Sequence, residues 1–264
     1  MQPDELARHI DEAAVAWDAR VQDPASIWMR PGCDLLLHQD QQLPGGRTHA
    51  QIVWRAMAAA GEHSASGYFM RAGSEWGVRT KASLTLARTT MLGAAKALYL
   101  LEPDDAETRI IRALLLLRTE AQDVHRLVKN WEDATPPMVD TLTSALRQEA
   151  DSLTAKTQEE LVRLGRKPDS KISEIELLTA AAAHLEDRLN DPQTRIGELW
   201  NVGSGNAHAR SWSWDTGLED DVPANQVVRV WRIPLDLLDT AWDLWNVRRG
   251  AEPASPEASR ALEG

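Results

Sequence analysis

The chain has 264 residues, with 29 Lys and Arg side chains against 40 Asp and Glu, and a formal net charge of −11. This acidic balance argues against a protein that coats nucleic acid through overall positive charge. Apolar residues make up 43% of the chain and charged residues 26%, close to the average of globular proteins. The sequence can therefore bury a hydrophobic core, and its length fits one large domain or two small ones.

The single cysteine and the chain start exclude several classes of protein. Cys33 cannot form an internal disulfide, and without a CxxC or a Cys/His cluster it predicts no zinc site. Residues 1–30 are charged throughout and lack the apolar run of a signal peptide. The apolar run at 113–117 is far shorter than the roughly 20 residues that cross a bilayer. We expect a cytoplasmic protein with no membrane segment, metal or cofactor.

Apolar residues recur at helical spacing along most of the chain. They predict six to eight helices joined by short turns and therefore an all-α fold, a single helical bundle. The expected helices span 4–20, 51–60, 81–102, 104–131, 135–164, 173–185, 191–200 and 235–248.

Capping residues indicate where several of these helices begin and end. Pro103 ends one helix, and Asp104, with Glu107 as its capping-box partner, begins the next, so we expect these two helices to form an αα-hairpin. Ser173 and Glu176 form a second capping box.

The segments between these helices are rich in turn residues. We expect a loop at 25–50, a glycine-bounded interruption at 61–67, a polar turn at 165–171 and an acidic loop at 215–226. The β-branched run at 227–233 stands apart from the helical pattern.

These elements predict three parts of the chain. A helix and loop at 1–50 pack on the bundle, the bundle itself spans 51–248, and 249–264 form a disordered tail.

The segment 200–214 has an unusual composition for a helical protein. Gly203 and Gly205 flank Ser204, and glycine permits close backbone approach or a positive φ. One interpretation places His208 at the start of a helix, where free backbone N–H groups attract anions. The alternative is that the glycines only make a tight turn and that His208 is a hydrogen-bonded residue of the bundle.

Three sequence elements together carry a resemblance to known proteins. Arg88 precedes an apolar helix that ends in Leu-Tyr-Leu-Leu-Glu-Pro at 98–103, followed by Glu-Thr-Arg-Ile-Ile-Arg-Ala at 107–113 and Ser-Gly-Asn-Ala-His-Ala-Arg at 204–210. Over about 80–215 this pattern resembles uncharacterised all-helical proteins, frequent in actinobacteria and also expected in phages, which carry a late SGxAHG element. That group in turn resembles the HEPN superfamily of helical bundles found in toxins, abortive-infection systems and RNA-processing enzymes.

The HEPN resemblance implies a homodimer that cleaves RNA without a metal at a composite site. In that chemistry His takes the 2′-hydroxyl proton and Arg stabilises the phosphorane. The resemblance makes His208, Arg210 and Ser204 the candidate catalytic residues. The chain departs from the pattern, because no Arg stands at the family's distance before His208 and Arg210 follows it. Arg118 and His125 have the required spacing and are the alternative pair, although chance alone also produces such a match.

Three further arginines and two tryptophans are candidates for binding. Arg88, Arg109 and Arg112 lie beside apolar helix faces and are expected to bind an anion or RNA. The alternative is that they pair at the surface with glutamates, namely Glu102, Glu107 or Glu120. Trp212 and Trp214 either stack on a base or pack in the core or a dimer contact.

Three functions follow from these patterns. The first is a HEPN-like module of phage–host conflict or RNA-related regulation, with 204–210 at its functional surface. The second is a metal-independent endoribonuclease that uses His208. The third is an acidic protein that binds or inhibits a protein partner. GxSxG, Walker A, GxGxxG and HExxH motifs are absent, so whether the chain is an enzyme, and whether its partner is RNA or protein, stays open.

Overall fold

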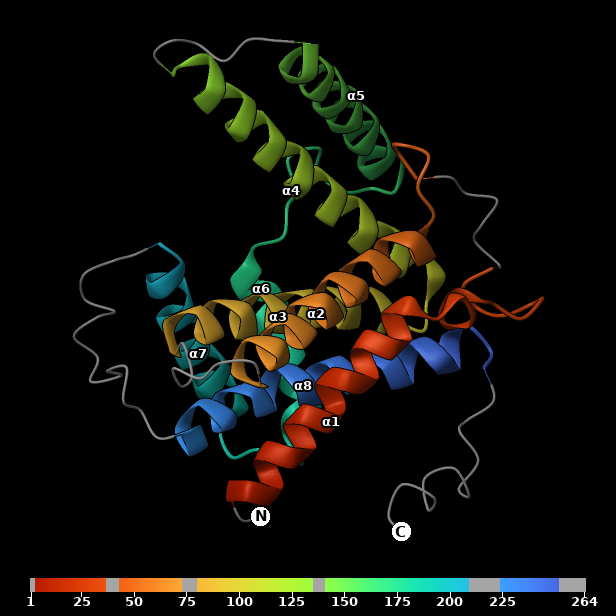
Figure 1. Ribbon diagram of the computed structural model, residues 1–264. Coiled ribbons are helices and arrows are strands. Elements are labelled where there is room, and N and C mark those ends of the chain that lie inside the picture. Colours follow the sequence, from red (N-terminus) through yellow and green to blue (C-terminus); the bar gives the residue numbers. More distant parts are fainter. Residues whose placement is uncertain (1–2, 37–42, 73–79, 135–140, 209–223, 252–264) are drawn as a thin grey trace.

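The computed structural model describes residues 3–36, 43–72, 80–134, 141–208 and 224–251. Over these ranges the fold is all-α, as the sequence predicted, and the described residues form eight α-helices, two short 3₁₀ helices and no strand (Figure 1). The elements are α1 (Pro3–Gln22), η1 (Pro24–Ile27), α2 (His49–Ala72), α3 (Thr80–Leu101), α4 (Ala106–Glu132), α5 (Thr141–Arg163), α6 (Glu174–Ala182), η2 (Ala183–Leu185), α7 (Pro192–Ala207) and α8 (Ala224–Arg248).

Helix α3 is the centre of the body of the molecule. It packs against α2, α6, α7 and α8, and α1 covers α2 and α8 from outside (Figure 1). One continuous hydrophobic cluster runs from Trp17 of α1 through Met91 of α3 to Trp245 of α8. The N-terminal helix and the loop after it therefore belong to the same core as the rest of the described chain.

Helices α4 and α5 extend away from this body (Figure 1). The buried residues of α4 concentrate between Arg109 and Ala121, and Val128 is its only buried residue beyond that point. α5 makes its helix contacts chiefly with α4. We call α5 and residues 121–132 of α4 the arm. The hairpin of this region is thus α4–α5, and the predicted α3–α4 hairpin is wrong, because the narrow apolar stripe of outer α4 matches a single partner helix.

The predicted interruption at 61–67 is also wrong, because the glycines that bound it serve helix packing. α2 continues through Gly61 and Gly67 without a break. A Cβ at Gly61 would lie 3.0 Å from the Trp17 ring, and one at Gly67 would lie 2.4 Å from the Trp231 ring. Both glycines therefore let another helix approach α2 closely, which outweighs their low helix propensity.

The cap of α4 lies one residue later than predicted. Asp105, not Asp104, accepts a hydrogen bond from the Thr108 backbone N–H at 2.7 Å. Hydrogen bonding from the Thr108 side chain and then from its backbone lowers the pKa of Asp105. Asp104 instead accepts from Arg248 at 2.6 Å. Both aspartates follow Pro103 in the sequence. Which of them caps α4 depends on the tertiary contact of Asp104 with Arg248.

Other predicted boundaries are confirmed or extended. The capping box of Ser173 and Glu176 is present at α6. α7 continues to Ala207 instead of ending near Trp200, and α8 begins at Ala224 and runs through Pro234. The β-branched run at 227–233 is therefore helical, and burial of Trp231 and Ile233 in it outweighs low helix propensity.

Several predicted segments lie outside the described residues. These are 135–140, residues 215–223 of the acidic loop, and 252–264 of the predicted tail. No helix in the described part of the chain is long and apolar enough to cross a membrane.

Helices α2 and α3 pack closely because Gly93 has no side chain. A Cβ at Gly93 would lie 2.7 Å from the backbone oxygen of Ala56 and 2.9 Å from the Cβ of Ala60. Nearby, the Thr90 hydroxyl donates a hydrogen bond to the Ala60 carbonyl at 3.3 Å. The two helices therefore run antiparallel with backbones in contact at this level.

We predict that Gly93→Ala destabilises the protein by about 1–3 kcal/mol, because a backbone oxygen cannot move away as a flexible side chain would. The matched control is Gly197→Ala in α7, where a Cβ meets nothing within 4 Å. That change should stabilise the protein by about 0.5–1 kcal/mol through helix propensity. Urea unfolding measures both. Equal stability of the two variants would contradict the packing described here.

Candidate functional site

The element at 204–210 lies at the opposite end of a helix from the one predicted. Ser204 belongs to α7, whose last residue is Ala207, and the backbone N–H of His208 donates to the Ser204 carbonyl at 3.0 Å. His208 is exposed, and Arg210 lies outside the described residues. The interpretation that places His208 at a helix start is therefore wrong. The alternative is wrong as well, because Gly203 and Gly205 lie within α7 instead of forming a turn and His208 is exposed. The free backbone groups near a helix C-terminus are carbonyls, which favour cations over anions.

Ser204 and Arg88, two predicted site residues, lie in contact. Arg88 Nε donates to Ser204 Oγ at 2.8 Å, and the guanidinium stacks on the ring of Trp200 at 3.8 Å. Glu174 lies 3.7 Å from Arg88 Nη2. Burial lowers the pKa of Arg88, and Glu174 opposes that effect. This cluster satisfies the Ser204 hydroxyl and joins α3 to α7.

Gly203 lies where α7 packs closely on α3. A Cβ at Gly203 would lie 2.7 Å from the Cβ of Arg88 and 3.0 Å from the Leu84 carbonyl oxygen. The sequence proposed either close approach or positive φ for these glycines, and at Gly203 the structure has close approach within a helix.

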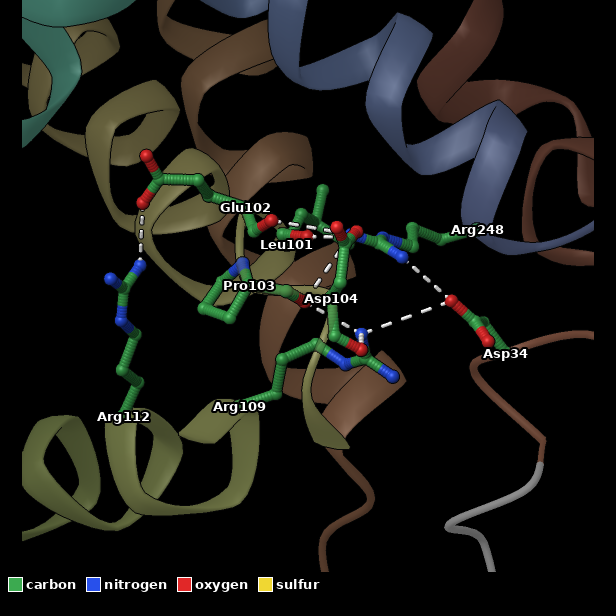
Figure 2. Close-up of polar contacts among 8 residues, drawn as sticks. All are labelled: Asp34, Leu101, Glu102, Pro103, Asp104, Arg109, Arg112 and Arg248. Atoms are coloured by element: carbon green, nitrogen blue, oxygen red, sulfur yellow. Dashed lines mark hydrogen bonds and ion pairs between the residues drawn. The ribbon is translucent and has the colours of Figure 1, made fainter. Parts of the chain in front are cut away.

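The polar contacts of Arg248 lie at the turn between α3 and α4 (Figure 2). Its side chain donates to the protein's own carbonyls and carboxylates. These acceptors are the carbonyls of Leu101 at 3.1 Å, Glu102 at 3.2 Å and Pro103 at 3.2 Å, and the carboxylates of Asp34 at 2.7 Å and Asp104 at 2.6 Å.

These bonds set the protonation of Arg248. Burial alone lowers its pKa, but the hydrogen bonds to Asp104 and Asp34 outweigh burial and raise it. Arg248 therefore stays charged while it joins α8, the α3–α4 turn and the loop before α2.

Arg109 and Arg112 bind the same turn (Figure 2). Arg109 is 2% exposed, and its Nη1 donates to the carbonyls of Pro103 at 2.7 Å and Asp104 at 3.0 Å. Burial lowers the pKa of Arg109. Arg112 Nη1 donates to the Tyr99 carbonyl at 2.7 Å and to Glu102 at 2.8 Å.

The three predicted anion-binding arginines do not form one cluster. Arg109 and Arg112 bind the C-terminal end of α3, whereas Arg88 lies about 20 Å away along that helix at 1.5 Å per residue. The weighed alternative, pairing with Glu102, Glu107 or Glu120, is present for Arg112 with Glu102. Arg88 instead lies near Glu174 of α6, which the sequence did not suggest.

The alternative pair, Arg118 and His125, faces α5, as its spacing on one helix face indicated. Arg118 is 6% exposed, and its Nη atoms lie 2.9 and 3.2 Å from the Gln158 side-chain oxygen when that amide is oriented to accept. His125 Nε2 lies 3.4 Å from Thr154 Oγ1 and 3.6 Å from Asp151 Oδ1. Both side chains contribute to the packing of the arm.

A groove that sequence reasoning missed follows the seam between α2 and α3 to the base of the arm. Its volume is about 260 Å³. We call it the elbow groove, and its lining residues are Arg47, Ile52, Arg55, Ala56, Ala59, Thr89, Leu92, Gly93, Lys96, Leu100, Leu116 and Glu120. Small and apolar side chains dominate this lining, so the groove exposes hydrophobic surface.

The cations of the elbow groove differ in their partners. Arg47 lies 3.3 Å from Glu120 and 3.8 Å from Glu149. Within the described residues, Arg55 and Lys96 have no carboxylate within 4.0 Å and no other recorded polar partner. Two positive charges on an apolar groove are thus available to a ligand.

A tight turn places Arg47 at the end of the groove. The Leu43 N–H donates to the Arg47 carbonyl at 2.9 Å, and between them Gly45 and Gly46 have φ of +82° and +67°. These left-handed angles favour glycine. A Cβ at Gly45 would lie 3.8 Å from Leu153 of α5, so the turn also contacts the arm.

Sequence patterns contain only a weak signal for this groove. Ala56 and Ala59 are small residues three apart in one helix, and Gly93 is a small residue of the next, which allows the two helices to approach closely. Whether Arg55 and Lys96 keep free charges depends on which carboxylates the fold brings near them, and a single sequence does not state that.

Neither a metal site nor a similar protein assigns a function to this chain. The described residues contain no group of three or more His, Cys, Asp or Glu side chains that could hold a metal. No known protein family, curated protein or solved structure matches this chain. The HEPN resemblance, the homodimer and the RNA or protein partner therefore stay predictions.

We predict that Arg248→Ala lowers the free energy of unfolding by about 1–3 kcal/mol, because it leaves the part-buried Leu101 carbonyl without a donor and Asp34 without its closest cation. The control is Arg126→Ala, which removes a surface ion pair to Asp123 from a side chain that is 72% exposed. That change should cost less than about 0.5 kcal/mol. Urea unfolding of both variants tests this, and a loss at Arg248 no larger than the control would refute the role given to it.

Proposed function

We propose that this protein is a helical binding module that holds a protein partner in the elbow groove, and that it does not cleave RNA through His208. The observation that carries the proposal is the pair of unpaired cations, Arg55 and Lys96, on an otherwise largely apolar groove. Apolar surface gains free energy when a partner covers it, at about 25 cal/mol per Å². Charges without internal partners add specificity and faster association.

Charge favours a protein partner over RNA. The chain carries −11 overall, so a long polyanion would meet repulsion beyond the groove. At physiological salt, charges separated by more than about 8 Å are largely screened. A short segment with a few carboxylates is therefore attracted mainly by Arg55 and Lys96 and is repelled little by the remaining acidic surface.

The contacts of the predicted catalytic residues count against the nuclease alternative. Ser204 Oγ already accepts from Arg88, and His208 follows the C-terminal end of α7. A phosphorane needs donors aimed at its developing negative charge. The carbonyl end of a helix instead stabilises an imidazolium cation.

The sequence resemblance implies a biological setting of phage–host conflict or RNA-related regulation. In that setting, a binding module acts by occupying or recruiting a partner protein. This proposal combines the first and third functions that the sequence suggested.

We predict that neither the wild-type protein nor His208→Ala cleaves total cellular RNA in the presence of EDTA. Both should also melt at the same temperature, because the exposed His208 side chain has no partner among the described residues. Gel analysis of fragments and their end groups checks the first point, and circular dichroism checks the second. Cleavage by the wild type that His208→Ala abolishes would establish the ribonuclease instead.

A further inference from the structure

We propose that the occupant of the elbow groove is an amphipathic α-helix of a partner protein, about three turns long, with Asp or Glu flanking its apolar stripe. This inference rests on the proposed function and names the chemistry of its partner. It does not involve the segment around His208.

The dimensions of the groove fit a helix. Its lining residues on α3 run from Thr89 to Leu100, which is about 16 Å at 1.5 Å per residue. That length matches about three turns of a partner helix. The floor contains Ala56 and Gly93, and small side chains at this level let the partner approach the α2–α3 seam closely.

The two free cations stand on opposite sides of the seam. Arg55 belongs to α2 and Lys96 to α3. Because the helices are antiparallel and Gly93 packs at the level of Ala56 and Ala60, one further turn of α3 brings Lys96 level with the turn that contains Arg55. A helix lying on the seam would therefore have one cation beside each flank, where its carboxylates can pair with both.

Other occupants fit less well. Pockets for small ligands commonly enclose about 300–1,000 Å³. The elbow groove has about 260 Å³, which is below that range, and it is only partly enclosed. A peptide strand needs an exposed sheet edge to extend, and the described residues contain no sheet. An amphipathic helix in an apolar groove is the recognition mode that remains consistent with this surface.

The test is selection of helical peptides on the full-length protein. A displayed library of peptides of about 16 residues, long enough for roughly four turns, is selected against the immobilised wild type. We expect the selected sequences to carry apolar residues at i, i+3, i+4 and i+7 with Asp or Glu beside them. Synthetic copies should become helical on binding, as circular dichroism reports.

Variants then locate the binding site. Fluorescence anisotropy should show at least about a tenfold loss of affinity for Arg55→Glu and for Lys96→Glu. Arg126→Glu changes the net charge equally on the exposed arm and should bind as the wild type does. Ala59→Trp fills an exposed part of the groove without changing charge and should also weaken binding. Thermal unfolding confirms that each variant is folded.

Several results would overturn the inference. They are the failure to select any peptide, the selection of basic or extended sequences, equal binding by Arg55→Glu and the wild type, or binding of labelled dodecanoate that the same groove variants abolish. Extended or basic peptides whose binding Arg55→Glu still weakens would overturn the helical occupant but leave a protein partner in the groove. Peptides that bind Arg55→Glu and the wild type equally would overturn both the inference and the proposed function.

Discussion

The C-terminal end of α3 is the constraint on which the other elements depend. The last carbonyls of a helix have no partner within it, and a buried carbonyl without a donor is costly. Here the Leu98 carbonyl accepts from the Glu102 N–H, and the next three accept from side chains of three different helices. Those donors are Arg112 of α4 for Tyr99, His49 of α2 for Leu100 in the tautomer protonated at Nε2, and Arg248 of α8 for Leu101.

This arrangement fixes where α4 begins and how it leaves the body. Arg109 is buried at the start of α4 and donates to the turn carbonyls of Pro103 and Asp104, while Arg248 reaches the same turn from α8. With its first turns held in this way, α4 makes a small contact with α2 and α3 and then extends with α5 as the arm (Figure 1). The elbow groove lies in the angle between α4 and the α2–α3 seam, so its shape follows from the same bonds.

The chain thus uses its arginines in two ways. Arg88, Arg109, Arg112 and Arg248 satisfy internal carbonyls, hydroxyls and carboxylates, and together they stabilise helix ends and crossings. Arg55, with Lys96, carries charge that nothing in the described structure neutralises. We therefore expect a partner to bind at the elbow groove, where charge remains free on apolar surface. This groove is separate from the segment at 200–214, whose composition was unusual in the sequence.

Local sequence signals predicted the parts of this fold that local physics controls. Helical periodicity gave the all-α class, and the Ser173–Glu176 box was predicted because its bonds are made within one turn. Predictions failed where a distant residue decides the outcome. Gly67 alone predicts a helix break, but in the fold it makes room for the Trp231 ring. Asp104 alone predicts a helix cap, but in the fold it binds Arg248. The groove was missed for the same reason, since the availability of Arg55 is a property of the folded surface.

Donors from other helices at the end of α3 hold the arm at a fixed angle to the body. Spin labels at Glu62 of α2 and Lys129 of α4, both exposed, in a Cys33→Ser background allow this angle to be followed by pulsed electron paramagnetic resonance. We expect one narrow distance distribution in the otherwise wild-type chain and a clearly broader one in Arg248→Ala under conditions where both are folded. An unchanged narrow distribution in Arg248→Ala would show that these donors do not hold the arm.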